Sequence, residues 1–341
     1  MSTEQHQAPP PEQMMAQFIN GKVVAMSVSV AAKLRIADKL AQSPLTNEEL
    51  ARDTKTHPQS LSRLMRALVS VGIFAQDAAG RYQLTPLSQL LRTGVKGSMR
   101  GMADFMGADW SWTAWGHLMH SVKTGTTAFN DVFGEPCFDY LGRHPEESAV
   151  FNEAMVGFSS GLADGIIKAY DFGQFNTIMD VGGGHGGLLL AILQATPKLK
   201  GIVFDAPHVV AGAIEPIRQA GLADRCTTIG GDFFQSVPGN VDAYVLKHII
   251  HDWNDVDAAR ILKTLRQGCE PGTKLILVEG VIPENNEPHF GKLLDLEMLV
   301  VASGRERTQA EFAQLLSQAG FRLEKVHTTK SPVDVIEAVA V

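Results

Sequence analysis

The chain has 341 residues, about twice the length of an ordinary domain, which predicts two folding units or one unit with a large appendage. Hydrophobic residues make up 45% and charged residues 20%, a globular composition that excludes a disordered, collagen-like or coiled-coil protein. The net charge of -7 gives no general field for holding polyanions, and the three cysteines have neither disulfide nor metal-ligand spacing. We therefore expect a cytoplasmic enzyme with neither a secretion signal nor a membrane-spanning segment.

The N-terminal part predicts a mainly helical unit. Residues 1–13 are polar and Pro-rich and are expected to form a disordered lead. From Val23 to Leu40 the chain is apolar and rich in small residues, which predicts a helix packed on several sides, in the interior or against another subunit. Thr46 and Glu49 form a capping box that opens a short helix.

A second short helix and a hairpin follow. The helix is expected from near Pro58 to before Gly72, and residues 73–84 have the pattern of a hairpin. Two short helices and a hairpin make a winged helix, so residues 14–100 are interpreted as a winged-helix-like domain. Such a domain can bind DNA, but between residues 46 and 92 we count only six basic residues against four acidic ones. This small excess favours a dimerising or structural use, and no nucleic-acid partner is expected.

Residues 101–170 predict a helical connector with many large apolar side chains. Three of the four tryptophans, Trp110, Trp112 and Trp115, lie within six residues of one another. Most of these side chains are expected to form a core between two domains. Some should also line a flat apolar pocket, because methionine and aromatic side chains suit planar ligands.

The second half of the chain changes to short apolar runs that alternate with helical stretches. The runs suited to buried strands are residues 176–181, 201–205, 225–229, 241–246 and 274–279. The helical stretches are residues 187–194, 207–220 and 256–268. This alternation predicts a parallel sheet covered on both faces, and hence a doubly wound, Rossmann-like α/β domain over residues 171–341. A terminal strand pair is expected at residues 321–327 and 333–341.

A glycine-rich turn from Asp180 to Gly187 follows the first of these strands. Its glycines allow positive φ and a close approach of the backbone to a ligand. Gly182 and Gly184 fit both the GxGxxG pattern of dinucleotide sites and the GxGxG pattern of S-adenosylmethionine sites. Asp205, after the second strand, would hold ribose hydroxyls in either case.

Two acidic residues favour S-adenosylmethionine over a dinucleotide. Asp180 suits the cationic ammonium of that cofactor, whereas its charge would be unfavourable beside a pyrophosphate. Asp232, after the third strand, offers an acceptor for an adenine amino group, and Phe233 offers an apolar face for the ring. The alternative for Asp232 is a helix cap.

These runs occur together with residues 204–208, residues 247–253, Glu279 and residues 304–308, in the order seen in small-molecule O-methyltransferases. Over nearly its whole length the chain resembles members of the caffeate, hydroxyindole and bacterial antibiotic-pathway type. The N-terminal winged helix of that family forms an intertwined dimer. The resemblance therefore implies a homodimer and the cofactor S-adenosyl-L-methionine, with S-adenosyl-L-homocysteine as product.

The resemblance also implies roles for individual residues. The family's cofactor contacts fall on Gly182 and its neighbours, Asp205, Asp232, Phe233 and Lys247. The general base falls on His251, and the acidic residues that position it fall on Glu279 and Glu306, with Asp252 beside them. The family's substrate-lining positions fall near a group of apolar residues, namely Phe105, Met106, Trp115, Phe151, Met155, Phe158 and Met298. Because Met106 and Phe158 are apolar where plant members tend to be polar, a lignin-type acceptor is disfavoured.

The chemistry accounts for this set of residues. Methyl transfer is an in-line displacement, so the enzyme aligns donor and acceptor and provides a deprotonated oxygen. A phenol has a pKa of about 10 and histidine about 6.5, a gap of roughly 4.8 kcal/mol, so proton loss should accompany methyl transfer or follow a lowered substrate pKa. A carboxylate on the far imidazole nitrogen would fix the tautomer, and either Glu306 or Glu279 suits that role.

We therefore expect a metal-independent O-methyltransferase that acts on a small aromatic hydroxyl compound, such as a phenolic, polyketide, phenazine or quinone-like acceptor. His248 and Asp252 are candidate metal ligands beside His251, but no third ligand has convincing spacing. The alternatives are the same fold and cofactor used for chemistry other than methyl transfer, a DNA-binding regulator, and a NAD-dependent dehydrogenase.

Overall fold

The computed structural model describes residues 9–341, apart from the side chains of residues 156 and 158–160. The chain divides into two compact units. The first consists of the described residues up to Trp112 together with Pro145–Phe158, and the second of Thr113–His144 and Ser159–Val341. Residues 101–170, expected as one connector, are thus shared between the two units.

The first unit opens with α1 (Pro11–Lys33) and α2 (Ile36–Leu40). Two expectations were wrong here. Residues 11–13 belong to a helix rather than to a disordered lead, because Pro11 occupies the first helical position, where its missing N–H costs nothing. The single helix expected from Val23 to Leu40 is broken at Arg35, whose left-handed φ of 52° redirects the chain so that Ile36, Ala37 and Leu40 enter the core.

The helix expected from Val23 is not packed on several sides at its start within the described chain, since Val23 is 59% and Val24 37% exposed; its packing against another subunit stays a prediction. Phe18 is 74% exposed and Ile19 is 71% exposed. By length and composition alone α1 could also cross a membrane, although a core helix or a signal sequence passes the same test, and the observation is weak. The apolar side chains of Phe18 and Ile19 on α1 are thus not covered by other residues of the described chain.

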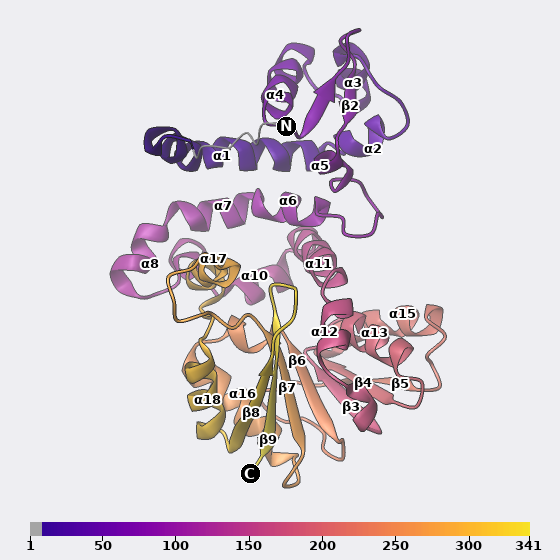
Figure 1. Ribbon diagram of the computed structural model, residues 1–341, viewed down its shortest axis with the longest axis vertical. Coiled ribbons are helices and arrows are strands. Elements are labelled where there is room, and N and C mark those ends of the chain that lie inside the picture. Colours follow the sequence, from indigo (N-terminus) through magenta and orange to yellow (C-terminus); the bar gives the residue numbers. More distant parts are fainter. Residues whose placement is uncertain (1–8) are drawn as a thin grey trace, which may run out of the picture. The chain divides into compact units, whose positions relative to one another are not determined.

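The winged helix is confirmed. It comprises α3 (Asn47–Thr54), α4 (Pro58–Ser70), β1 (Phe74–Gln76) and β2 (Tyr82–Leu84), as Figure 1 shows. The Thr46 side chain and Glu49 form the expected capping box at the start of α3. On α4, Leu61, Met65 and Leu68 face a core shared with Phe74 and Tyr82 of the hairpin.

A series of helices then leads to the second half of the chain. Their bounds are α5 (Pro86–Gln89), α6 (Arg100–Met106), α7 (Asp109–Gly116), α8 (Leu118–Thr124), α9 (Ala128–Phe133), α10 (Cys137–Arg143), α11 (Pro145–Ser160), α12 (Ala163–Ala169) and the 3-10 turn η1 (Phe172–Gln174). The predominantly helical character expected for residues 101–170 is therefore observed.

The second unit contains a seven-stranded sheet in the order β5-β4-β3-β6-β7-β9-β8. The first five strands of that order are parallel, and β9 and β8 add an antiparallel pair at one edge. The strands are β3 (Thr177–Val181), β4 (Lys200–Asp205), β5 (Cys226–Gly230), β6 (Ala243–Lys247), β7 (Lys274–Glu279), β8 (Phe321–His327) and β9 (Asp334–Ala340). This confirms the doubly wound, Rossmann-like α/β prediction.

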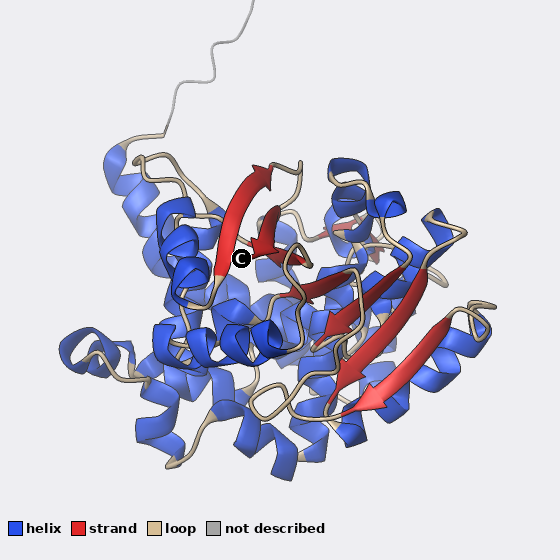
Figure 2. Cartoon of the chain, turned by 90° about the horizontal axis from the view of Figure 1, so that it is seen from below, coloured by secondary structure: helices blue, strands red, loops and turns tan. Residues whose placement is uncertain are grey.

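Helices cover both faces of the sheet, as Figure 2 shows. They include α13 (Gly187–Ala195), α14 (Pro207–Val210), η2 (Ala211–Ala213), α15 (Ile214–Gln219), η3 (Ile250–Asp252), α16 (Asp255–Gln267), α17 (Phe290–Glu297), the π-helical turn η4 (Met298–Ala302) and α18 (Gln309–Gln318). The one helix expected over residues 207–220 is three pieces. Pro216 has no N–H to donate to the carbonyl of Gly212, which disfavours a continuous helix there, and Pro216 lies in the first turn of α15.

The strand order explains where a site can form. Neighbouring strands β4, β3, β6 and β7 are parallel, so their carboxyl ends lie at one edge of the sheet. The strands are almost fully buried, which fixes their register and hence the residues that emerge at that edge. Ligands bind at this edge in open α/β sheets.

Candidate active site at the carboxyl edge of the sheet

The predicted cofactor residues emerge from the carboxyl ends of adjacent strands. Asp180 lies near the end of β3 and is followed by the glycine turn, Asp205 ends β4, and Lys247 ends β6. Glu279, predicted to position the base, ends β7. Residues that are distant in sequence are thus brought to one edge by the register of the parallel strands.

The glycine turn contains three glycines with positive φ, namely Gly182, Gly184 and Gly186. Gly182 has a φ of 72° and Gly184 a φ of 57°, conformations that other residues adopt only with strain. A Cβ atom at Gly182 would also lie 2.4 Å from Cδ1 of Ile249. The absence of a side chain at Gly182 therefore leaves room for the side chain of Ile249, two residues before His251.

The amide groups of this turn are largely engaged inside the protein. The N–H groups of Gly182 and Gly183 donate to the carbonyl of Phe204, and that of Gly184 donates to Oδ2 of Asp205 at 2.8 Å. These amides are unavailable to a pyrophosphate, which disfavours the dinucleotide alternative for this glycine pattern. The acidic surroundings suit a cationic ligand instead.

Asp180 lies beneath the turn and is 3% exposed. Burial raises the pKa of Asp180 to about 7, and the nearby ammonium of Lys247 opposes that rise. Burial likewise lowers the pKa of Lys247, while Asp180 and Glu279 oppose the change. A buried carboxyl group of this kind is suited to an additional cation from a ligand, because a second positive charge would favour its ionised form.

The two other acidic residues predicted to bind cofactor make local bonds in this structure. Asp205 accepts hydrogen bonds from the backbone of Gly184 and of Ala206, so its carboxylate is held against the glycine turn. Asp232 is exposed and accepts from the N–H of Phe234 within a turn; no helix begins between β5 and β6 in the described chain, so Asp232 does not cap a helix, which was the alternative. Phe233 beside it is half-buried and packs against Trp253.

His251 is buried on η3 and has three carboxyl groups around its ring. Its Nδ1 lies 2.7 Å from Oε1 of Glu306 and 3.9 Å from Oε2 of Glu279. Its Nε2 lies 3.4 Å from Oδ1 of Asp252. Of the two candidates for orienting the imidazole, Glu306 is therefore the one within hydrogen-bond distance.

Glu279 contacts the backbone of the loop that carries His251. Its Oε1 accepts hydrogen bonds from the N–H groups of Ile249 at 3.1 Å and Ile250 at 2.9 Å. These bonds satisfy two amides at the start of η3 and fix the path of the chain into His251. Glu279 thus positions the loop, whereas Glu306 positions the ring.

The cluster is electrostatically coupled. Burial by itself lowers the pKa of His251, but Asp252, Glu279 and Glu306 outweigh it and raise that pKa to about 10. Burial raises the pKa of Glu279 to about 7, although the imidazole of His251 opposes this change. Burial also raises the pKa of Asp252 to about 6. The arrangement therefore stabilises an imidazolium, the form that a histidine base takes after it accepts a proton.

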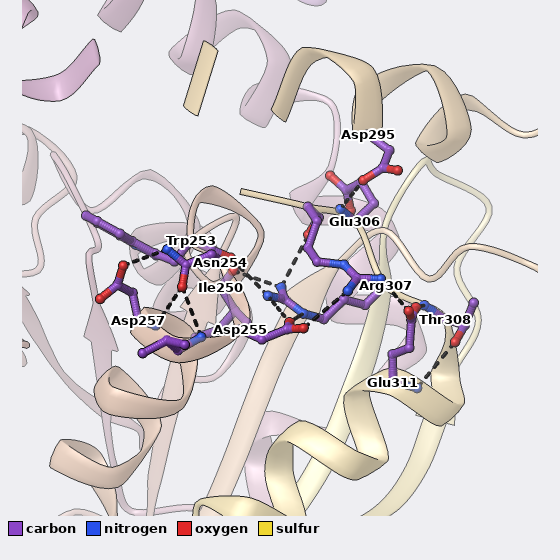
Figure 3. A network of polar contacts seen from close by, with 12 residues as sticks. Ile250, Trp253, Asn254, Asp255, Asp257, Asp295, Glu306, Arg307, Thr308 and Glu311 are labelled. Carbon is purple, nitrogen blue, oxygen red and sulfur yellow. Dashed lines mark hydrogen bonds and ion pairs between the residues drawn. The ribbon is translucent and has the colours of Figure 1, made fainter. Parts of the chain in front are cut away.

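A polar network around Arg307, drawn in Figure 3, holds the loops that carry His251 and Glu306. The Arg307 side chain is fully buried and donates to the carbonyls of Ile250 and Trp253 and to the carboxylate of Asp255. Asp295 accepts from the N–H of Glu306 at 2.8 Å. Sequence reasoning included Arg307 in its motif but gave it no role, and it missed Asp295.

A candidate set of metal ligands has one member that sequence spacing did not reveal. His248, His251 and Glu279 each offer an atom within 4.8 Å of the others, and Glu279 comes from a different strand. Nδ1 of His251 bonds Glu306, and Oε1 of Glu279 accepts two backbone N–H groups. These contacts engage one ligand atom each of His251 and Glu279 within the protein.

The predicted substrate-lining residues are divided between the two units. Phe105 and Phe151 pack edge to face in the first unit, where Met155 is half-buried and Met106 is 41% exposed. Phe158 belongs to the same unit, and its side chain lies outside the described residues. In the second unit, Trp115 is half-buried and Met298 is buried at the start of η4.

Comparison with known proteins identifies the family. Residues 115–322 match the model of the O-methyltransferase domain, and residues 16–94 match that of the O-methyltransferase dimerisation domain. The chain belongs to the O-methyltransferase family. It is an S-adenosylmethionine-dependent O-methyltransferase of the kind found in phenazine and antibiotic pathways, which confirms the resemblance drawn from the sequence.

Three relatives illustrate the family. The phenazine O-methyltransferase PhzM of Lysobacter antibioticus is 44% identical over 331 residues, which cover 97% of each chain. The 8-amino-8-demethylriboflavin N,N-dimethyltransferase of Streptomyces davaonensis is 38% identical, over 95% of this chain and 94% of that one. The solved structure of NcsB1 from neocarzinostatin biosynthesis, in complex with S-adenosylmethionine and 2-hydroxy-5-methyl naphthoic acid, has a TM-score of 0.81 at 33% identity, over 93% of this chain and 96% of that one.

Proposed function

We propose that this O-methyltransferase methylates a hydroxyl group of a small aromatic acceptor, with His251 as the general base. The observation that carries the proposal is the 2.7 Å contact between Nδ1 of His251 and Oε1 of Glu306. A carboxylate on Nδ1 leaves Nε2 as the nitrogen that takes the acceptor's proton. Asp252, beside Nε2, helps to stabilise the imidazolium that results.

The cofactor residues act in binding and alignment. Bound S-adenosylmethionine supplies an activated methyl group on its sulfonium. Asp180 holds the ammonium of the cofactor, Asp205 holds its ribose, and Asp232 with Phe233 and Lys247 holds the adenine end. Gly182 and Gly184 keep the turn free of side chains, so that the cofactor can lie against the backbone.

The base and the acceptor are matched in acidity. A phenol with a pKa of about 10 would lose its proton to an unperturbed histidine only at a cost of several kcal/mol. The carboxyl groups around His251 raise its pKa, which reduces the difference in pKa between the base and a phenol. Proton removal from Nε2 must then precede each turnover, so we expect activity to increase with pH.

The acceptor is proposed to be a planar phenolic, polyketide, phenazine or quinone-like compound. Support comes from the apolar side chains of Trp115 and Met298 and from relatives named as a phenazine O-methyltransferase and a mitomycin biosynthesis 6-O-methyltransferase. The proposed assembly is a homodimer formed through the N-terminal domain, since residues 16–94 match the dimerisation model. We further propose a cytoplasmic enzyme that needs no metal for transfer and has no nucleic-acid or membrane partner.

A second candidate is methylation of an acceptor nitrogen, favoured by the relative named as an N,N-dimethyltransferase. An amine acceptor also loses a proton during transfer, so the same imidazole could serve. The two candidates differ in the atom that carries the new methyl group.

Product analysis tests the proposal. The purified chain is incubated with deuteromethyl-labelled S-adenosylmethionine and a panel of hydroxylated phenazines, naphthols and quinones. We expect one S-adenosylhomocysteine for each methyl group found on oxygen. Label found only on nitrogen would favour the second candidate. S-adenosylhomocysteine without any methylated product, or turnover without S-adenosylhomocysteine, would contradict the proposal.

A further inference from the structure

A buried carboxyl group outside the cluster around His251 is only half engaged. Glu297 is the last residue of α17 and is 8% exposed. Its Oε2 accepts a hydrogen bond from Nε1 of Trp115 at 2.5 Å. Its Oε1 is buried and has no hydrogen-bond partner among the described residues. A buried polar atom left in this state calls for an explanation.

The surroundings of Glu297 connect it with the acceptor site. Trp115, which bonds it, and Met298, which follows it, are two of the residues predicted to line the acceptor pocket. Glu297 also lies where α17 passes into the π-helical turn η4, and such turns are common at functional sites. The turn η4 contacts both α10 and η3, the element that carries His251.

Cys137, on α10, gives a second indication of this placement. Its pKa is raised to about 12 by burial and then by the charges of Asp252 and Glu297. The thiol therefore lies within electrostatic reach of both carboxylates. Glu297 thus belongs to the surroundings of the base, although it does not touch His251.

A purely structural role explains one oxygen of Glu297 and not the other. The indole N–H of Trp115 fixes Oε2 and so fixes the direction of Oε1, which is the behaviour expected of a preorganised ligand contact. We infer that Oε1 of Glu297 accepts a hydrogen bond from a second polar group of the methylated compound. The enzyme would then select aromatic compounds that carry an N–H or O–H donor in addition to the hydroxyl that is methylated. This inference rests on the proposed function.

Glutamine at this position makes a sharper prediction than an apolar residue. The indole N–H of Trp115 would still require an acceptor, so the amide oxygen of the Glu297→Gln variant would face Trp115 and its NH₂ group would take the place of Oε1. The group that faces the substrate would change from a hydrogen-bond acceptor, Oε1, to a hydrogen-bond donor, NH₂. The variant should then prefer a substrate with a carbonyl group over one with an amino group.

Competition between matched naphthols tests the inference. Naphthols with an amino, methyl or acetyl group at each ring position are methylated by the wild type, Glu297→Gln and Glu297→Met. We expect the wild type to prefer the amino over the methyl compound by about tenfold or more in kcat/KM for at least one ring position. Glu297→Met should abolish the preference, and Glu297→Gln should shift it toward the acetyl compound. Glu284→Met, at an exposed position, is the matched control.

The outcomes separate this inference from the proposed function. If no ring position gives an amino preference above twofold in the wild type, or if both Glu297 variants retain the wild-type preference, the inference is wrong while O-methylation stands. If the wild type methylates only hydroxylated phenazines or quinones, the substituted series is made on that scaffold. If it methylates no hydroxylated phenazine, naphthol or quinone on oxygen, the proposed function fails first, and the inference falls with it. Should Glu297→Met fail to fold, the isosteric Glu297→Gln variant decides the question by the direction of its shift.

Discussion

At the scale of single residues, the proposed mechanism depends on the imidazole of His251 and the three carboxyl groups around it, those of Asp252, Glu279 and Glu306. The raised pKa of His251 means that the cluster holds a proton at neutral pH, and that Nε2 becomes available as the pH increases toward about 10. Because the groups titrate together, a pH profile reports the cluster rather than one residue. We therefore expect kcat/KM to increase with pH over the alkaline range.

Replacing Glu306 with glutamine tests this assignment. The change removes one of the charges that raise the pKa of His251 but keeps a hydrogen-bond acceptor, so the rising limb of the pH–rate profile should move to lower pH by about one to three units. Glu284→Gln, a change at an exposed site, should leave the limb in place. If the rising limb of the Glu306→Gln profile lies at the same or a higher pH than that of the wild type, the charge of Glu306 does not raise the pKa of His251.

Asp180 makes cofactor binding depend on pH. Its raised pKa, about 7, means that the carboxyl group is largely protonated below neutrality and becomes ionised above it. A cationic ligand binds the ionised form, so affinity for S-adenosylhomocysteine, which retains the ammonium, should increase from pH 6 to 8, by up to about tenfold per pH unit below the pKa. Calorimetry across that range measures it, and Asp180→Asn should flatten the dependence. Equal slopes for both proteins would show that Asp180 does not contact the ammonium.

At the scale of secondary-structure elements, Arg307 joins the two loops that form the base cluster. Replacing it with methionine leaves the carbonyls of Ile250 and Trp253 without their donor, which should lower the free energy of unfolding by about 3 kcal/mol. Arg305→Met is the matched control, because Arg305 forms exposed ion pairs and should cost less than about 1 kcal/mol. Urea denaturation measures both, and equal losses would show that the buried network is not what holds these loops.

The bounds of the buried parallel strands were predictable to within one or two residues, because short apolar runs between helical stretches are typical of such strands. The residues at the carboxyl ends of the strands followed from those bounds. The break at Arg35 was not predictable, because a positive φ at arginine has no sequence signal, whereas Pro216 is itself a sequence signal for the break before α15. Motifs of a few consecutive residues were predictable from the sequence, but contacts between residues distant in the sequence were not.

The same limit applies to the site. His251 and Glu306 were found through a motif, yet only the structure distinguishes the ring contact of Glu306 from the backbone contacts of Glu279. Glu297 stands in an apolar run and offered no pattern, because its partner Trp115 is 182 residues away. Such residues are recognised by burial and by an unsatisfied oxygen.

At the scale of the whole molecule, the exposed face of α1 and the match to a dimerisation domain point to a second copy of the chain. Placing aspartate at Phe18 and Ile19 would force two charges into the proposed interface, so the double variant should sediment as a monomer at concentrations where the wild type is a dimer. Val256→Asp, at a site 79% exposed in the second unit, should remain dimeric. A dimeric α1 variant would exclude this face from the interface.

The most direct test of the account compares wild type and His251→Ala on a series of phenols of decreasing pKa. If His251 removes the acceptor's proton, its loss should lower kcat by about 100- to 10,000-fold for an unactivated phenol. The loss should shrink toward unity for phenols that are already ionised at the assay pH. A loss below tenfold on the unactivated phenol, or an equal loss across the whole series, would contradict the central claim that His251 is the base.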